Sequence, residues 1–421
     1  MPQNWKTYKL TDIAMIVMGQ SPKGETTNEV GDGLPLLNGP TEFGYSYPIP
    51  TQFTTDPRKV SEVGDLLFCV RGSTTGRMNY SNQAYAIGRG IGAFRGINGY
   101  PTRFVKYVIN FYLDRMLSLC TGSTFPNLSR TDLESFPIEI CDQDEAQSIA
   151  RILSALDDKI ELNLAMNRAL EDMAMVLYKH WFVDFGPFQL LEFIDSELGR
   201  IPKGWEVKRL DELASFSNGY AFKSNDLLKQ EEEDCLHVFK MGHIQKGGGL
   251  KAEGTKSWIK KSNCRGLDKY VLKEGDILMS MTDMKDNMTI LGHTALMNEN
   301  GKYIVNQRVG LLRVKNHISV GYPFLYILTN SVDYIDRLRS QANSGVQVNL
   351  STDAIKSSKA LVASPIINSK FHESLLPMFM QINQNAIENQ TLTALRDTLL
   401  PKLISGEVRV KAAEQQLNAV L

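Results

Sequence analysis

Apolar residues recur with a period of about 3.5 residues in two stretches of the chain. In the first stretch the a positions are Ile149, Leu156, Asn163, Leu170 and Leu177, and the d positions are Leu153, Ile160, Asn167, Ala174 and Trp181. In the second stretch they are Phe371, Met378, Asn385, Leu392 and Leu399, with Leu375, Ile382, Asn389, Arg396 and Leu403. A heptad pattern sustained over about four repeats predicts two long helices that pair as a coiled coil.

The ends of these helices are predicted from nearby breaker residues. The first helix should run from about residue 143 to 181 and end before Phe185-Gly186-Pro187. The second should end near Leu400-Pro401 or Ser405-Gly406. Pro377 lies inside the second pattern, so we expect it to kink this helix or to mark a late start.

The rest of the chain predicts sheets. Short apolar runs, such as residues 65–70 and 276–280, are bounded by Gly, Pro, Asn and Ser, which is typical of short strands joined by loops. One helical stretch follows in each part, at about residues 103–119 and 322–339. Each part is therefore predicted to be an α+β domain with many loops.

The two halves of the chain repeat one another. Trp5, Leu10, Ala14 and Gly19 recur 200 residues later as Trp205, Leu210, Ala214 and Gly219. Gly64-Asp65 recurs as Gly275-Asp276, and Asn127-Leu128-Ser129 as Asn349-Leu350-Ser351, at offsets of 211 and 222. The last offset then stays constant through the helical pattern, so insertions are confined to the first part of each copy. We predict domains at residues 1–141 and 201–365, with helical spacers at residues 142–200 and 366–421.

The predicted fold class is α+β, with two α/β domains in tandem repeat. They would be separated by two long antiparallel coiled-coil helices related by a pseudo-twofold axis. Such an axis would bring the middle of each helix opposite the middle of the other, where Asn163, Asn167, Asn385 and Asn389 occupy seam positions. These four amides are expected to form one polar layer that fixes helix register. The alternative is a solvent-exposed waist without that role.

Composition narrows the class of protein. Hydrophobic residues make up 43% and charged residues 22%, which is ordinary for a globular protein. We expect no export signal, membrane span, disulfide framework or metal site, since the chain lacks an apolar leader, C-x-x-C and H-x-x-x-H. Residues 141–200 carry 5 basic against 12 acidic side chains, which assigns this segment to protein partners or solvent rather than to an anionic ligand.

Catalytic motifs are missing from the sequence. It contains no G-x-x-x-x-G-K-[ST], no G-x-S-x-G and no N-P-P-Y-like loop. The run Gly88-x-Gly90-x-Gly92 predicts a tight turn rather than a cofactor site. Asp195 with Glu206-x-Lys208 loosely resembles a nuclease set, but Lys6 and Tyr8 replace the last two in the other copy. The chain is therefore predicted to be non-catalytic.

Polar side chains in the loops favour a nucleic-acid reader. Arg and Lys bond guanine edges, and Asn and Gln bond adenine edges, in the major groove. Any one such residue is more often merely solvated, but both copies place polar loops at matching positions. The candidate contacts in the first copy are Ser21, Lys23, Arg71, Ser73, Thr74, Arg77, Arg89, Ser123, Thr124 and Asn127. Those in the second copy are Tyr220, Lys223, His243, Thr282, Lys285, Gln307, Arg308, Ser344, Gln347 and Asn349.

The order of these motifs resembles the DNA-specificity subunit of type I restriction-modification enzymes. The carrying residues are residues 204–210, 218–223 and 273–278, Asn127-Leu128-Ser129, residues 156–163 and the terminal residues 399–407. With the duplication, the resemblance covers nearly the whole chain. The first copy departs from the pattern, with Gly19-Gln20-Ser21-Pro22 in place of Gly219-Tyr220-Ala221-Phe222.

The resemblance implies a function in host defence. Each variable half would be a target recognition domain reading one half of a split, asymmetric DNA site, and the helices would set the gap. A helix of ~39 residues spans ~58 Å at ~1.5 Å per residue, more than one duplex turn of ~34–36 Å. The family implies two methyltransferase subunits, which carry S-adenosylmethionine and methylate adenine. It also implies ATP- and Mg-dependent restriction/translocase subunits. The chain itself would hold no cofactor, and its expected location is the cytoplasm of a prokaryotic cell.

Two further expectations concern partners. Apolar side chains left after helix pairing predict a protein interface: Met166, Met173, Met175, Val176, Tyr178, Trp181, Phe182, Leu395, Leu399, Leu403 and Ile404. The rival interpretation is a protein-binding scaffold that never meets DNA, and a third is an enzyme that acts alone. Steep salt dependence of duplex binding would separate the first two, because phosphate contacts release counterions.

Overall fold

The chain folds into two compact units, each built from both halves of the sequence. The computed structural model describes residues 4–44, 46–120, 127–251, 254–285, 288–315, 320–343, 345 and 347–413. Unit 1 comprises Met1–Asn163 and Ile387–Leu421, and unit 2 comprises Leu164–Ala386. Each of the two long helices therefore contributes one segment to each unit.

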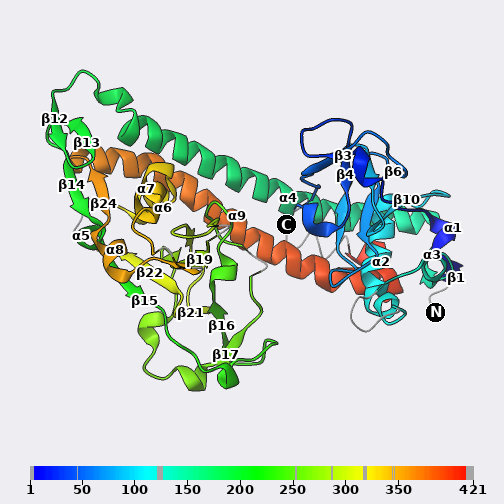
Figure 1. Cartoon of the computed structure of the whole chain (residues 1–421). Helices are drawn as coiled ribbons and strands as arrows, with labels where there is room; N and C mark the ends of the chain where they lie inside the picture. Colours follow the sequence, from blue (N-terminus) through cyan, green and yellow to red (C-terminus); the bar gives the residue numbers. More distant parts are fainter. Residues whose placement is uncertain are drawn as a thin grey trace. The chain divides into compact units, whose positions relative to one another are not determined.

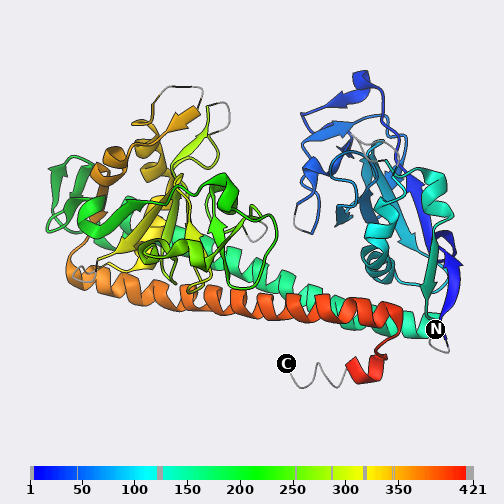
Figure 2. The ribbon, with the colours of Figure 1, turned by 90° about the horizontal axis from the view of Figure 1, so that it is seen from below.

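Unit 1 contains two main sheets and a short strand pair. A four-stranded antiparallel sheet has the order β2 (Ala14–Met18), β10 (Ile91–Gly96), β7 (Leu66–Cys69), β8 (Met78–Tyr80). A five-stranded sheet has the order β3 (Thr27–Asn28), β5 (Gln52–Thr54), β4 (Leu34–Leu37), β9 (Tyr85–Ile87), β6 (Val60–Ser61), with β4 and β9 parallel. The pair is β1 (Lys6–Lys9) with β11 (Pro137–Ile140), and the helices are α1 (Leu10–Ile13), α2 (Thr102–Leu117) and α3 (Arg130–Glu134). Figure 2 shows these sheets to one side of the helix segments of unit 1.

Unit 2 repeats the four-stranded sheet. Its order is β15 (Ala214–Asn218), β22 (Val309–Val314), β18 (Ile277–Ser280), β20 (Thr294–Leu296). The smaller sheets are β17 (Trp258–Lys260), β16 (Cys235–Phe239), β21 (Tyr303–Val305); β14 (Glu206–Arg209) with β24 (Lys359–Val362); β12 (Phe193–Ser196) with β13 (Gly199–Pro202); and β19 (Thr282–Met284) with β23 (Gln347–Asn349). The short helices are α5 (Leu210–Leu213), α6 (Tyr322–Asn330), α7 (Val332–Arg339) and α8 (Thr352–Ser357). The predicted duplication is thus visible as a repeated strand order.

The repeated Gly-Asp motif forms the same turn in both units. Gly64 and Gly275 adopt positive φ angles of 88° and 83°, which favour glycine. The buried carboxylate of Asp65 then accepts two hydrogen bonds from Arg95, at 2.7 and 3.0 Å. In unit 2, Asp276 accepts two from Arg313, both at 2.7 Å. The duplicated motif therefore pins the start of the central strand to its neighbour.

The long helices are α4 (Gln143–Tyr178) and α9 (Pro365–Ser405), and in each unit their segments lie side by side and antiparallel (Figure 1). The predicted seams are largely buried, with Leu153 and Leu403 at 0% exposure. The helix α4 continues as a π-helical turn over Lys179–Val183, and Phe185 then turns left-handed with a φ of 52°. This confirms the predicted first helix end. No helix in the described part of the chain is long and apolar enough to cross a membrane.

The second helix begins earlier than the late-start alternative suggests. It runs without interruption from Pro365 through Pro377 to Ser405, so Pro377 does not mark its start. Proline is tolerated at Pro365 because the first N–H groups of a helix have no intrahelical partner. The predicted end at Ser405 is confirmed.

The two repeated tryptophans anchor each unit to the end of one helix. In unit 1, Trp5 Nε1 donates a 2.7 Å hydrogen bond to Ile404 O, and its ring lies 5.4 Å from the Arg409 guanidinium. In unit 2, the Trp205 ring packs against Phe182 and Phe188 at centroid distances of 5.2 and 5.0 Å. Both tryptophans are buried. A duplicated residue therefore serves the same anchoring role in each unit.

Candidate nucleic-acid interface

Several loops of unit 1 meet at one edge of its sheets. Gly19 N donates to Ile91 O at 2.9 Å, and a Cβ on Gly19 would lie 2.2 Å from Gly88 O. Only glycine allows this close approach of two backbone segments. The contact brings Ser21 beside the β9–β10 turn, where its Oγ accepts a 3.3 Å hydrogen bond from Arg89 N.

A second pair of loops joins this edge. Arg71 and Asn127 form an isolated antiparallel bridge, and Arg71 Nε donates to Asn127 Oδ1 at 3.1 Å. Val70 N donates to Gly90 O at 2.9 Å, so this pair lies next to the turn that carries Arg89. The guanidinium of Arg77 bonds Pro40 O at 3.3 Å.

Most candidates of unit 1 are therefore placed on one surface with exposed cations. Lys23, Ser73 and Thr74 are also exposed on loops of this unit, while Ser123 and Thr124 lie outside the described residues. Guanidinium and ammonium groups in this setting suit phosphate or guanine contacts.

Each residue of the repeated Asn-Leu-Ser motif has the same structural role in both units. The asparagine pairs with the strand-end loop: Asn127 with Arg71, and Asn349 with Thr282. The leucines are buried, at 1% and 3% exposure for Leu128 and Leu350. The serines cap a helix: Ser129 Oγ accepts from Asp132 N at 3.2 Å, and Ser351 Oγ from Ala354 N at 3.0 Å.

Unit 2 builds a matching edge from the repeat mates. A Cβ on Gly219 would lie 2.2 Å from Asn306 O, and Tyr220 O accepts a 2.9 Å hydrogen bond from Gln307 N. Met281 N donates to Arg308 O at 3.3 Å, which brings this turn beside the start of β19. Tyr220, Lys223, Gln307, Arg308 and Lys285 are exposed, and Ser344 lies outside the described residues.

His243 does not belong to this surface. It is 1% exposed, its ring stacks on Phe239 at 4.9 Å, and its Nε2 lies 3.3 Å from His237 Nε2. Burial lowers the pKa of His243 to about 4, and the neighbouring His237 is the second largest cause of this decrease. The structure thus corrects its assignment as a direct DNA contact. Its side chain instead closes a turn, with Nδ1 accepting from Lys240 N at 3.1 Å.

Two unit 1 residues on this edge were missed by sequence reasoning. Asn38 Nδ2 donates to Gln52 Oε1 at 3.0 Å. Asn38 also packs so closely on the glycine turn that a Cβ on Gly88 would lie 2.4 Å from its Oδ1. The available signal was the pair Gly88 and Gly90, which leaves room for a polar neighbour.

The spacer asparagines form two amide pairs, one in each unit. In unit 1, Asn163 Nδ2 donates to Asn389 Oδ1 at 2.9 Å and to Glu388 Oε2 at 2.8 Å. In unit 2, Asn385 Nδ2 donates to Asn167 Oδ1 at 2.7 Å. Asn163 and Asn385 are 0% and 2% exposed, which excludes the solvent-exposed waist.

Backbone contacts repeat around these pairs. Asn167 Nδ2 reaches Ile382 O at 3.3 Å in unit 2, and Asn389 Nδ2 reaches Ile160 O at 3.5 Å in unit 1. Ile382 is the repeat mate of Ile160, and Asn389 is the repeat mate of Asn167. The pseudo-symmetry of the sequence therefore extends to individual hydrogen bonds.

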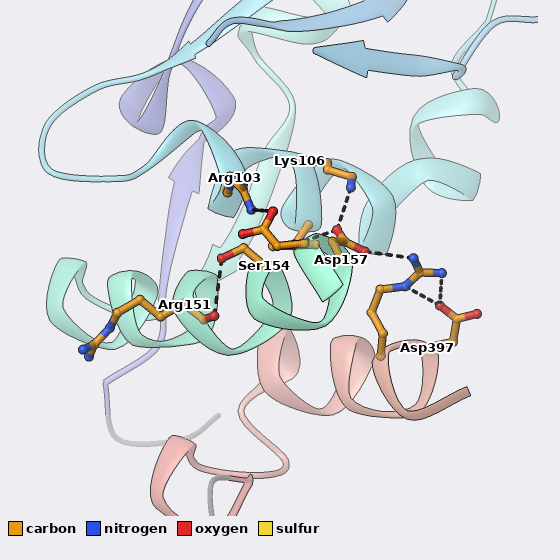
Figure 3. A network of polar contacts seen from close by, with 9 residues as sticks. Arg103, Lys106, Arg151, Ser154, Asp157 and Asp397 are labelled. Atoms are coloured by element: carbon orange, nitrogen blue, oxygen red, sulfur yellow. Dashed lines mark hydrogen bonds and ion pairs between the residues drawn. The ribbon is translucent and has the colours of Figure 1, made fainter. Parts of the chain in front are cut away.

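A charged cluster fastens α2 to both helix segments of unit 1 (Figure 3). The carboxylate of Asp157 accepts from Lys106 Nζ at 2.8 Å, from Tyr107 OH at 2.8 Å and from Arg396 Nη1 at 2.9 Å. Burial alone would raise the pKa of Asp157. Lys106, Arg396 and Tyr107 together hold it below its ordinary value. The neighbouring Asp158 pairs with the more exposed Arg103, at 2.6 Å.

The same positions in unit 2 are apolar or aromatic. Phe379 is the repeat mate of Asp157, and Ala174 is the mate of Arg396. The Phe379 ring packs against Tyr326 of α6 at 5.7 Å, where unit 1 has the Lys106 contact. The contact of α2 with the long helices is therefore ionic in unit 1, and the matching contact of α6 in unit 2 is hydrophobic.

The apolar surface predicted on the helices is smaller than expected. Tyr178, Phe182, Leu399, Leu403 and Ile404 are at most 5% exposed, because they pack inside their own units. Met166, Met173 and Val176 remain 38%, 56% and 67% exposed on α4. These three residues are the exposed apolar stripe of α4.

Comparison with known proteins agrees with this architecture. The family model of the type I restriction modification DNA specificity domain matches residues 2–172 and 202–361. The chain is 24% identical over 442 residues to the type I restriction enzyme MjaIX specificity subunit of Methanocaldococcus jannaschii, covering 98% of this chain and 95% of that relative. It is 26% identical over 342 residues to the type I restriction enzyme HindI specificity subunit of Haemophilus influenzae, covering 70% and 74%.

A solved structure shares the fold. The S subunit of a type I restriction-modification system from M. genitalium superposes with a TM-score of 0.55 at 18% identity, covering 95% of this chain and 96% of that one. The family model matches most of the chain and falls on both repeats. The chain therefore belongs to the DNA specificity subunits of type I restriction-modification systems, with one specificity domain in each repeat.

Proposed function

In each unit, the edge at which the loops described above meet is called the recognition edge. We propose that the recognition edge of each unit contacts one half of a bipartite, asymmetric DNA site. The observation that carries this proposal is the repeated edge itself. In both units a close-approach glycine, a β-turn cation or amide and the Asn-Leu-Ser segment converge. The residues differ between the copies, with Arg71 and Arg89 in one and Thr282 and Gln307 in the other. Two edges of equal architecture and unequal chemistry suit two different half-sites.

The helix pair would set the gap between the half-sites. Register errors are costly because a shifted helix would bring the buried amides of Asn163 and Asn385 against Leu or Ile without a partner. The amide pairs would therefore hold the length of the spacer and, through it, the gap in the DNA site.

Catalysis would come from partner subunits. The chain would direct two methyltransferase subunits, which use S-adenosylmethionine to methylate adenine. It would also direct restriction/translocase subunits that need ATP and Mg. The exposed apolar stripe of α4 supports a protein partner on that helix, since adjacent exposed apolar side chains usually mark an interface. The acidic residues 141–200 would disfavour phosphate there.

The test is a methylation map of the reconstituted complex. The full chain is coexpressed with the partner methyltransferase subunits in a host without adenine methylation, and modified adenines are located by sequencing. The proposal expects one bipartite, asymmetric motif with a fixed gap. A continuous motif, or methylation without sequence preference, would contradict it.

A further inference from the structure

Unit 2 carries a two-stranded antiparallel ribbon at its recognition edge. Strands β19 and β23 pair over three positions, Thr282↔Asn349, Asp283↔Val348 and Met284↔Gln347. In unit 1 the described residues of the equivalent contact are Arg71 and Asn127, which form an antiparallel bridge.

The two faces of this ribbon have opposite character. Val348 is 3% exposed and faces the hydrophobic core of unit 2 together with Met281 and Leu350, which flank the ribbon. Because side chains alternate along a strand, Met284 and Gln347 point the other way. Both are exposed, Met284 to 55%.

Hydrogen bonds hold the backbone of the ribbon in place. The carboxylate of Asp283 accepts from Met284 N at 2.8 Å and from Ile290 N at 2.9 Å. On the other strand, Asn343 Oδ1 accepts from Asn349 N at 2.8 Å. The ribbon is therefore preorganised, which lowers the entropy lost when a ligand binds.

The outward face of the ribbon carries the side chains of Thr282, Met284, Gln347 and Asn349. Thr282 Oγ1 donates to Met241 Sδ at 2.8 Å, and Asn349 Nδ2 donates to Gln347 O at 3.1 Å. Within the described residues, no hydrogen bond engages the Gln347 amide. Directly across from it lies the apolar side chain of Met284. Exposed cations flank this pair, with Lys285 after β19 and Arg308 beside its start.

This chemistry fits the major groove of duplex DNA. Two strands about 4.8 Å apart fit a groove about 12 Å wide and 8.5 Å deep. A glutamine amide matches the N6 donor and N7 acceptor of adenine, and an apolar side chain matches the methyl group of thymine. The flanking cations would neutralise phosphates.

We propose that the β19–β23 ribbon enters the major groove and that Gln347 reads one adenine in the half-site of unit 2, with Met284 against a thymine methyl. This inference rests on the proposed function. A bidentate amide–adenine contact gives roughly tenfold to hundredfold discrimination between bases.

The experiment compares Gln347→Ala and Gln347→Glu with Gln341→Ala, each in the full chain with methyltransferase subunits. Gln341 is an exposed amide just before the ribbon segment, bonded to Arg337 O at 3.4 Å. Methylated adenines are mapped, and binding is measured on duplexes that carry each single base-pair change. Thermal unfolding checks that each variant is folded. The isosteric Glu variant keeps the shape of the side chain, removes the amide donor and adds a negative charge.

We expect Gln347→Ala to reduce the preference for one A·T pair in one half-site by about tenfold to a hundredfold. The other half-site and the gap should stay unchanged, and Gln341→Ala should match the wild type. Gln347→Glu should weaken binding to the same A·T pair. A folded Gln347→Ala that keeps the full motif, or that relaxes at a G·C pair or in both halves, overturns the inference. A wild-type complex without a bipartite motif overturns the proposed function and this inference with it.

Discussion

Removing the carboxylate of Asp157 should destabilise unit 1 far more than removing its neighbour Asp158. The Asp157 side chain is 17% exposed and accepts from two cations and one hydroxyl. Breaking a buried pair by removing one partner costs roughly 3–5 kcal/mol. Water reaches Lys106 and Arg396, which are 22% and 27% exposed, so we expect about 2–4 kcal/mol for Asp157→Ala.

Asp158→Ala is the matched control. Both residues lie in the interior of α4 and both pair with α2, so the change in helix propensity cancels. Asp158 and Arg103 are 54% and 43% exposed, and exposed pairs contribute about 0–1 kcal/mol. The comparison therefore isolates burial and the number of partners.

The assay is urea unfolding of the full chain, followed by hydrogen exchange of peptides from each unit. We expect Asp157→Ala to lower the midpoint for peptides of α2 and of residues 387–405, and to leave peptides of residues 214–314 unchanged. Equal shifts for the two variants, or a loss below about 1 kcal/mol for Asp157→Ala, would refute the reasoning.

Four further predictions concern pH, packing, partners and register. The free energy of unfolding of Asp157→Asn should fall below that of the wild type by its largest amount above the ordinary Asp pKa of 3.8. This difference should vanish as pH falls through the lowered pKa of Asp157 in the folded state, as followed by unfolding from pH 6 to 2. Gly219→Ala should cost about 1–3 kcal/mol in urea unfolding because its Cβ would strike Asn306 O, whereas Gly24→Ala, which meets no atom within 4 Å, should cost little. Val176→Glu on the exposed apolar stripe of α4 should reduce copurification with methyltransferase subunits while the melting temperature of the chain alone is kept; undiminished copurification would remove the stripe from the interface. Replacing the four spacer asparagines with Leu should keep or raise the melting temperature and loosen the gap between half-sites; a methylation map with an unchanged gap would refute the register role.

Periodic and repeated features of the chain could be predicted from the sequence. The heptad positions located α4 and α9, and the duplicated Gly19 and Gly219 located the converging loops, because local backbone requirements leave a residue pattern. Contacts between distant segments left no such pattern. The partners of Asp157 lie about 50 residues before it and 239 residues after it, and the heptad places Arg396 at a core position without naming its ion pair.

Burial was the second property that local patterns left open. His243 carries a polar ring, yet aromatic neighbours enclose it, and the exposure of a ring depends on residues far along the chain. The predicted apolar surface shrank for the same reason, since Phe182 packs on Phe371 at 4.8 Å across 189 residues of sequence. Among the candidate contacts, the exposure of Gln347 could not be predicted from the sequence, because it depends on the register in which β19 pairs with β23.

The central claim is that each repeat reads its own half-site while the helices hold the gap. Exchange of residues 1–141 for the equivalent segment of a relative with a different specificity tests it most directly, with modified adenines mapped in complexes of the wild-type and chimeric chains. The account predicts that one half-site changes to that of the relative, while the other half-site and the gap stay as in the wild type. A change in both half-sites, or in the gap length, would contradict it.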